Sequence, residues 1–251
     1  MAYGVGIRQS EMTTTEFVKK ITDSANSYPD AVFSTPGKVY TCVNPYSYHM
    51  VRKNAGLYSR LDGLFVDGFT MCMWIRLLWG CKIPRLSFDM SSMAADLFDA
   101  LNGDMRDRSI YFLGTRQEAI EKTIDRIRSS YPSMNIKGFR NGYFKDDNER
   151  NEAIARIVEL NPDFVIIGMG SPIQERFVLD LKKGGYKGIA FTCGGFLHQT
   201  SERINYYPAW VNKLNLRAFY RLYKEKGMAG RLWQVLVGFP AYFIYDSFKN
   251  R

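Results

Sequence analysis

The chain has few of the residues that hold metals or build disulfide frameworks. Its 251 residues include two histidines and four cysteines, and no two cysteines form a Cys-x-x-Cys pair. Widely spaced cysteines in a chain of this length are typical of free buried thiols in a reducing compartment. His49 is isolated, and His198 has no Cys/Asp ligand pattern nearby. The sequence therefore predicts no metal site.

Several catalytic and nucleotide-binding patterns are also absent. There is no Asp-x-Asp, the usual carboxylate pair that holds a metal–nucleotide diphosphate, and no Gly-x-Ser-x-Gly elbow. The third glycine of the dinucleotide fingerprint and the Gly-Lys-Ser/Thr of a P-loop are missing. A transferase with this sequence would need cationic side chains or helix dipoles to stabilise a leaving diphosphate.

Long apolar runs are missing as well. The nearest candidate, residues 235–245, is interrupted by Gly238 and Pro240 and is shorter than the ~20 residues that a transmembrane helix needs. The N-terminal stretch has no basic segment followed by an apolar one, so no signal peptide is predicted. We expect a cytoplasmic protein, either soluble or peripheral.

What the chain has in excess is positive charge. Its 34 Lys and Arg against 25 Asp and Glu give a net charge of +9, which suggests an anionic partner: nucleic acid, anionic lipid or a phosphorylated substrate. With 46% hydrophobic and 15% aromatic residues the chain can bury a core, which excludes a disordered protein.

Short apolar runs alternate with amphipathic stretches, the pattern of an α/β protein with a Rossmann-like, largely parallel sheet flanked by helices. Strands are predicted at residues 38–43, 64–66, 109–113, 136–139, 164–167 and 188–192. Helices are predicted at residues 46–57, 71–79, 91–101, 117–130, 148–160 and 172–183.

The composition changes near residue 205, which divides the chain into an α/β core (1–205) and a helical C-terminal appendage (206–251). From Lys213 onward there are eight Lys/Arg against two acids, with aromatic residues interleaved throughout. Such a segment is typical of a membrane interface, where rings lie at headgroup level and cations meet anionic lipid. The alternative is a pair of helices that pack on the core with a solvated basic face.

One local pattern resembles a ligand-binding turn. The apolar strand at 164–167 ends in Gly168-Met-Gly170, and Ser171, Pro172 and Gln174 then form the start of a helix with a capping box. Glycines let a ligand approach the backbone, and the helix N-terminus offers free N–H groups to a phosphate. An ordinary tight turn remains the alternative for this segment.

Two aspartates compete for a catalytic role at the second strand. Asp67-Gly68 follows the apolar run at 64–66, where an α/β fold places ligand-facing carboxylates, and Asp62-Gly63 lies five residues earlier. Spacing alone does not choose between them.

A series of motifs resembles the WecG/TagA/CpsF glycosyltransferases (family 26) in order and spacing over about residues 38–235. The motifs are Asp67-Gly68, Arg76-Leu-Leu-Trp-Gly80, Pro84-Arg85, Asp89, Tyr111-Phe-Leu-Gly114, Tyr131-Pro132, Gly142-Tyr-Phe144, Pro162-Asp163, Gly168-Met-Gly-Ser-Pro172, Gln174-Glu175, Pro208-Ala-Trp210 and Tyr220-Arg-Leu222. The Gly-x-Gly-x-Pro-x-Gln-Glu element is the specific one.

The resemblance implies an inverting transfer of a hexose or N-acetylhexosamine from a UDP-sugar to a polyprenyl-diphosphate-linked sugar in bacterial surface or exopolysaccharide assembly. It also implies work at the inner face of the cytoplasmic membrane, reached through the appendage, with no cofactor, no metal and no nucleic-acid partner. Homo-oligomerisation is left open.

The resemblance also assigns roles to residues. It favours Asp67 over Asp62 as general base, and it makes Arg221 and Arg231 the residues that neutralise the diphosphate, with Arg85 and Arg217 as weaker candidates. The substrate-binding residues that it implies are Thr41, Asn44, Arg85, Asp89, Gly114, Gly142, Tyr143, Gly168, Gly170, Pro172, Gln174 and Glu175.

Departures from the family pattern fall where sugar recognition is expected. Cys42 occupies the slot of a threonine, so that Thr41 is displaced, and Arg85 and Asp89 are one residue closer than in the family. His198 stands where an aspartate is usual, Tyr206 replaces an arginine, and Arg217-Ala218 replaces Glu-Trp. These changes leave the donor open between N-acetylmannosamine and a hexose such as glucose.

Two other classes of function remain as alternatives. A nucleic-acid-binding protein would use the positive charge, but no recognition-helix, RRM-like or zinc-finger pattern is present. A nicotinamide-dependent oxidoreductase would use the Gly-x-Gly turn, but no acidic residue follows a second strand at the required distance. The sequence favours the transferase.

Overall fold

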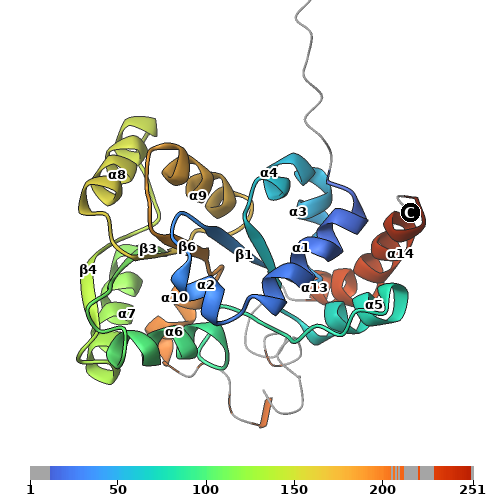
Figure 1. The fold of residues 1–251 in the computed structure, drawn as a ribbon, viewed down its shortest axis with the longest axis horizontal. Coiled ribbons are helices and arrows are strands. Elements are labelled where there is room, and N and C mark those ends of the chain that lie inside the picture. The colour runs from blue at the N-terminus through green and yellow to red at the C-terminus, as the bar shows by residue number, and fades with distance from the viewer. Residues whose placement is uncertain are drawn as a thin grey trace, which may run out of the picture.

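The computed structural model describes residues 12–204, 206, 208, 210–211, 220 and 229–249. Its centre is a sheet covered by helices (Figure 1). The sheet has six parallel strands in the order β2-β1-β6-β5-β3-β4. The strands are β1 (Val39–Val43), β2 (Gly63–Val66), β3 (Ser109–Gly114), β4 (Asn135–Arg140), β5 (Phe164–Gly168) and β6 (Ile189–Thr192). The predicted α/β, Rossmann-like class is confirmed.

Helices cover both faces of the sheet. One face carries α1 (Thr14–Asn26), α3 (Tyr48–Lys53), α4 (Ala55–Ser59), α5 (Phe69–Trp79), α8 (Asp147–Leu160) and α9 (Ile173–Lys183). The other carries α2 (Asp30–Ser34), α6 (Met93–Asn102), α7 (Gln117–Ser130) and α10 (Phe196–Glu202). The described C-terminal segment forms α13 (Ala229–Trp233), the π-helical η1 (Gln234–Gly238) and α14 (Phe239–Lys249).

The central strands alternate between two hydrophobic cores. In β3, Ile110 and Phe112 contact the core under α6 and α7, whereas Tyr111 and Leu113 contact the core under α8 and α9. Side chains of a strand point alternately to the two faces, so a strand covered by helices on both sides is apolar throughout. This is why the sequence shows these strands as continuous apolar runs.

Two local features differ from the prediction. The single helix expected at 46–57 is two helices, because Asn54 has a non-helical φ of −127° and its side-chain amide donates to the Met50 carbonyl oxygen at 2.9 Å, which ends α3. Helices α1, α2 and α10 were not expected, although Thr13 and Glu16 form a capping box at the start of α1.

The C-terminal helix is joined to the core. Phe239 and Phe243 are buried against Tyr48. Asp246 accepts two hydrogen bonds from Arg52, at 2.6 and 3.0 Å, and one from the Tyr48 hydroxyl at 3.0 Å. The boundary at 205/206 stays a prediction, but α14 packs as part of the fold. None of the helices in the described parts of the chain is long and apolar enough to cross a membrane.

Candidate active site

A crevice opens at the carboxyl ends of β1, β5 and β6. The chain leaves β1 and β5 toward the face that carries α3 and α9, and it leaves β6 toward the opposite face, to α10. Ligands of parallel α/β sheets bind where neighbouring strands diverge in this way. A cavity of about 610 Å³ lies there, lined by Asn44, Tyr46, Ser47, Met50, Gly170, Ser171, Gly194, Gly195, His198, Gln199, Glu202 and Tyr206.

Gln174 ties together the two glycine loops that border this cavity. Its side chain is 2% exposed, and its Oε1 accepts the backbone N–H groups of Gly170 and Gly194, both at 3.2 Å. The predicted capping box is therefore wrong: α9 begins at Ile173 with Pro172 as its N-cap and no side-chain cap. The amide of Gln174 is bonded to loop N–H groups instead of the helix start.

Glu175 lies beneath the same loops and is fully buried. Its Oε1 accepts hydrogen bonds from the hydroxyls of Thr41 and Ser171, each at 2.9 Å, and from the Gln174 amide at 3.0 Å. Burial, with a further contribution from Glu175, raises the pKa of the adjacent Tyr58. Thr41, Gln174 and Glu175 thus support the floor of the site, and direct contact of these residues with a substrate stays a prediction.

The predicted glycines divide into two kinds. A Cβ on Gly114 would lie 2.3 Å from the Gly168 carbonyl oxygen, and one on Gly142 would lie 2.9 Å from the Gly114 Cα. Gly168 is similarly enclosed, by Cys193 and Gly194. Close packing of backbone explains these three positions. Gly170, by contrast, has a φ of +78° and open space where a side chain would stand, so it leaves room for a ligand at the cavity wall.

Asp67 lies directly after β2, at the same carboxyl edge of the sheet. Its Oδ1 accepts a hydrogen bond from Arg85 Nη2 at 2.8 Å, and its side chain is 37% exposed. Gly68 turns the backbone away with a φ of +138° and leaves space for Pro45. The carboxylate is therefore held in place and open to solvent at once.

Arg85 links Asp67 to Asp89. Its Nη2 also donates to Asp89 Oδ2 at 2.9 Å. Burial alone would lower the pKa of Arg85, but the two carboxylates outweigh burial and raise it. The charge of Arg85 is thus already shared between two acids, which weakens its candidacy as a diphosphate ligand. The backbone N–H and hydroxyl of Ser91 donate to the other oxygen of Asp89, at 2.9 and 2.7 Å.

Asp62 lies at the opposite, amino end of β2. It accepts hydrogen bonds from Lys182 Nζ at 2.6 Å, the Val39 N–H at 2.9 Å and Lys38 Nζ at 3.3 Å. Burial alone would raise the pKa of Asp62. The three donors outweigh burial, so the pKa of Asp62 lies below its usual value. The contacts give Asp62 a structural role. Asp67 is the aspartate at the carboxyl edge of the sheet, although it is not among the residues that line the cavity.

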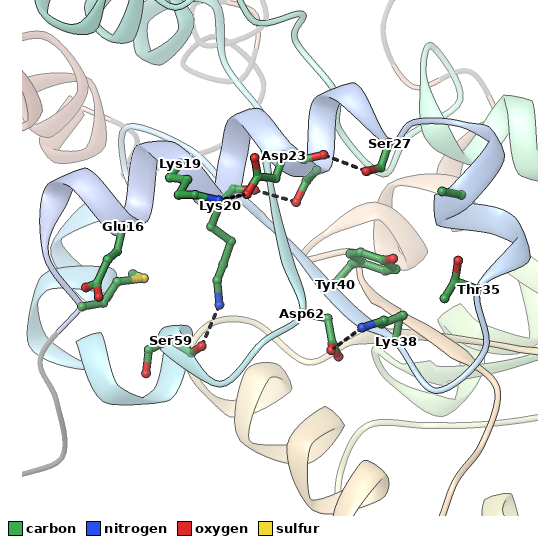
Figure 2. A pocket seen from close by; sticks show the side chains of 13 residues that line it. Glu16, Lys19, Lys20, Asp23, Ser27, Thr35, Lys38, Tyr40, Ser59 and Asp62 are labelled. Carbon is green, nitrogen blue, oxygen red and sulfur yellow. Dashed lines mark hydrogen bonds and ion pairs between the residues drawn. The ribbon is translucent and has the colours of Figure 1, made fainter.

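A second hollow, of about 520 Å³, opens beside Asp62 at this amino edge (Figure 2). Its charged groups are bonded to one another or to backbone. Lys20 donates to the carbonyl oxygens of Ser59 and Leu61, both at 2.6 Å, and Lys19 pairs with Asp23 at 2.6 Å. The residues that the sequence analysis assigned to catalysis and substrate binding are therefore sought at the carboxyl edge of the sheet, not in this hollow.

The remaining predicted residues are placed as follows. Asn44 lines the cavity, and its Oδ1 accepts the Ser47 N–H at 2.8 Å just before α3. Tyr143 is exposed on the loop between β4 and α8. Arg221 and Arg217 lie outside the described residues; Arg231 is in α13, but its side chain is also outside them.

Sequence reasoning missed most of the α10 side of the cavity. Gln199 and Glu202 line it together with His198. The available signal was the pair Gly194-Gly195 after a strand, which repeats the strand–glycine–helix pattern of residues 164–174. The described lining includes one acid and no lysine or arginine. In the described parts of the chain, no group of three His, Cys, Asp or Glu could hold a metal ion.

Comparison with known proteins decides the family. The model of the glycosyl transferase WecG/TagA/CpsF family matches residues 3–251. The chain belongs to this family. The resemblance inferred from the sequence is thus confirmed. Members of this family are glycosyltransferases, so the match argues against the oxidoreductase and the nucleic-acid-binding protein.

Several curated members of the WecG/TagA/CpsF family are similar to this one. A UDP-Gal:alpha-D-GlcNAc-diphosphoundecaprenol beta-1,4-galactosyltransferase of Shigella boydii is 32% identical over 213 residues, which are 84% of this chain and 86% of the relative. An N-acetylglucosaminyldiphosphoundecaprenol N-acetyl-beta-D-mannosaminyltransferase of Bacillus subtilis (strain 168) is 26% identical, over 82% of this chain and 77% of its own. The enzyme of that name from Bacillus spizizenii is 24% identical, over 94% and 88%.

Proposed function

We propose that this protein transfers a hexose or N-acetylhexosamine from a UDP-sugar to a polyprenyl-diphosphate-linked sugar, with inversion at the anomeric carbon. The family and the names of the three relatives support the reaction class and the polyprenyl-linked acceptor. The observation that carries the residue assignment is the position of Asp67, held by Arg85 and partly exposed at the carboxyl edge of the sheet.

The reaction is a single displacement in which the acceptor hydroxyl attacks the anomeric carbon opposite the leaving UDP. A hydroxyl is a poor nucleophile at neutral pH, so a carboxylate takes its proton as the bond forms, a contribution of typically ~10²–10⁴-fold. Asp67 is this base. Because Arg85 donates to Oδ1, we assign the proton to Oδ2.

The nucleotide lies near Gly168, Gly170 and Pro172, where the N-terminus of α9 faces the cavity. The positive end of the helix dipole at such a terminus favours a phosphate. The described lining offers no cation, so Arg221 and Arg231 of the appendage complete the diphosphate site. Arginine suits this role because its planar fork binds phosphate oxygens in pairs.

The sugars meet the polar wall of the cavity. Asn44 orients a sugar hydroxyl through its amide, while Asp89 acts mainly by holding Arg85. Relatives named for galactose and for N-acetylmannosamine keep both donor classes in the proposal, and their names favour an acceptor whose sugar is N-acetylglucosamine. The product enters bacterial surface or exopolysaccharide assembly at the cytoplasmic face of the membrane.

Asp67→Asn tests the assignment of the base. The amide keeps the shape of the side chain but cannot accept the proton, so turnover falls by two or more orders of magnitude while UDP-sugar affinity and Tm barely change. The measurement is UDP release with a lipid-diphosphate-sugar acceptor. Asp62→Asn is the matched control, because Asp62 lies on the same strand at the opposite edge. Near-normal turnover of Asp67→Asn, or a comparable loss in the folded Asp62→Asn protein alone, contradicts the assignment.

Metal independence is tested by chelation. Because the diphosphate is proposed to be neutralised by arginines, full turnover is expected in excess EDTA, measured by the same UDP-release assay. A strict requirement for Mg²⁺ or Mn²⁺ would refute this part of the proposal.

A further inference from the structure

The outer face of α5 exposes large apolar side chains. Phe69, Met73 and Leu77 are 55%, 45% and 68% exposed, whereas Met71 and Ile75 on the inner face are buried. The exposed three are spaced four residues apart and therefore form one stripe along the helix, about 12 Å long at 1.5 Å per residue. Scattered exposed apolar residues are normal, but a continuous stripe marks an interaction surface.

The helix that carries the stripe contacts a second helix that also exposes apolar side chains. Helices α5 and α14 lie side by side (Figure 1). Trp79 Nε1 donates to the Ser247 hydroxyl at 3.2 Å. The segment α13–η1–α14 exposes Trp233, Leu236, Val237, Tyr242, Tyr245 and Phe248. We call the α5 stripe together with these six residues the α5–α14 surface.

We propose that α5, an element of the catalytic core, rests on an anionic lipid bilayer through Phe69, Met73 and Leu77, next to the aromatic residues of α14. Tryptophan and tyrosine prefer the membrane interface, because one part of the ring system is apolar and another can be hydrated. The charges agree: Arg76 and Lys82 beside the stripe and Lys249 on α14 are exposed, and Asp246, the acid of α14, is paired with Arg52. A basic and aromatic surface of this kind fits anionic headgroups better than it fits a second, equally basic copy of the chain.

The position of α5 explains why a core element contacts lipid. Helix α5 begins two residues after Asp67, so a bilayer under α5 brings the proposed base to the headgroup level. A polyprenyl diphosphate is anchored in the bilayer with its sugar at that level. This step rests on the proposed function; lipid binding by the stripe does not.

The test is a double variant, Met73→Ser with Leu77→Ser, in the full chain; Phe69 is left unchanged because it is close to Asp67. We measure co-sedimentation with vesicles of neutral and anionic lipid, turnover of a polyprenyl-linked acceptor in those vesicles, and turnover of a water-soluble short-chain acceptor. We expect vesicle affinity and vesicle-based turnover to fall at least tenfold, with short-chain turnover and Tm unchanged. Met73→Leu with Leu77→Ile keeps the apolar surface and should bind vesicles normally. Glu118→Ser with Lys122→Ser, on α7 across the molecule, should also bind normally.

Each outcome decides the inference. Unchanged vesicle binding by the serine variant overturns it, as does a variant that alters only the oligomeric state in gel filtration, which would make the stripe a contact between copies. Equal loss of turnover on both acceptors overturns it too, because the defect would then lie in the site. If the unaltered protein binds vesicles through Met73 and Leu77 but turns over neither acceptor, the proposed function fails and the lipid surface stands.

Discussion

Two aspartates at the ends of one strand have opposite roles. Asp62 and Asp67 are each followed by glycine, and no local pattern in the sequence separates them. The structure separates them through partners far away in the chain: Lys182 bonds to Asp62 across 120 residues, and Arg85 bonds to Asp67. An aspartate followed by glycine was therefore predictable from the sequence, but the choice between Asp62 and Asp67 needed the family resemblance or the fold.

Asp62 should give the protein part of its resistance to acid. The pKa of Asp62 is lowered in the folded state, so its stabilising effect is complete above the unfolded pKa of about 3.9 and disappears as the pH falls through the folded value. Asp62→Asn is expected to cost about 1–3 kcal/mol at pH 7 and much less at pH 2. Urea unfolding at both pH values measures this difference. Asp23→Asn, which removes an exposed pair with Lys19, should cost less than about 0.5 kcal/mol at pH 7; equal costs for the two variants would contradict the structural role of Asp62.

At the scale of elements, periodicity predicted all six strands and the helices between them. The helix at 117–130 matches its predicted bounds, because its apolar positions recur at helical spacing and Gly114-Thr115 precedes it. Predictions were wrong where a polar side chain hydrogen-bonds to a partner that the local sequence pattern does not indicate. Gln174 bonds to loop N–H groups instead of a helix start, and Asn54 ends α3 from within an otherwise helical pattern.

The contact of β3 with β5 depends on glycine. Gly114→Ala would force its Cβ to within 2.3 Å of the Gly168 carbonyl oxygen at a φ of +153°, and we expect a loss of about 2–4 kcal/mol in the free energy of unfolding. Gly230→Ala meets nothing within 4 Å and lies in a helix, so it should be neutral or stabilise by up to about 1 kcal/mol. Denaturant titration of both variants checks this contrast; a mild effect of Gly114→Ala would show that the two strands can move apart.

At the scale of the whole molecule, composition alone predicts a C-terminal appendage distinct from the core. In the fold, α14 of that appendage packs against the core. The buried rings of Phe239 and Phe243 could not be told from the exposed ones beforehand, because the tail carries aromatic residues on every side. Which of them turn inward depends on Tyr48 and Arg52, residues about 190 positions earlier that the local sequence does not indicate.

A pair of phenylalanines on α14 tests this joining. Phe243→Ala removes a fully buried ring and should cost about 3–5 kcal/mol. Phe248→Ala removes a ring that is 67% exposed and should change the stability by less than about 0.5 kcal/mol. Thermal or urea unfolding of the full chain distinguishes the two. Equal, small effects would mean that α14 folds separately from the core.

The strand order has a consequence for how the chain is made. Of the strands in the described parts of the chain, the one synthesised last, β6, lies in the interior of the sheet, between β1 and β5. Until residue 192 has left the ribosome, the β2-β1 pair and the β5-β3-β4 set share no strand pairing. Besides its permanent outer edge, each set then has a second unpaired edge, β1 or β5, which β6 later covers. Open edges of apolar strands invite pairing with other chains. We therefore expect the nascent protein to be most prone to aggregation just before β6 closes the sheet and the crevice together.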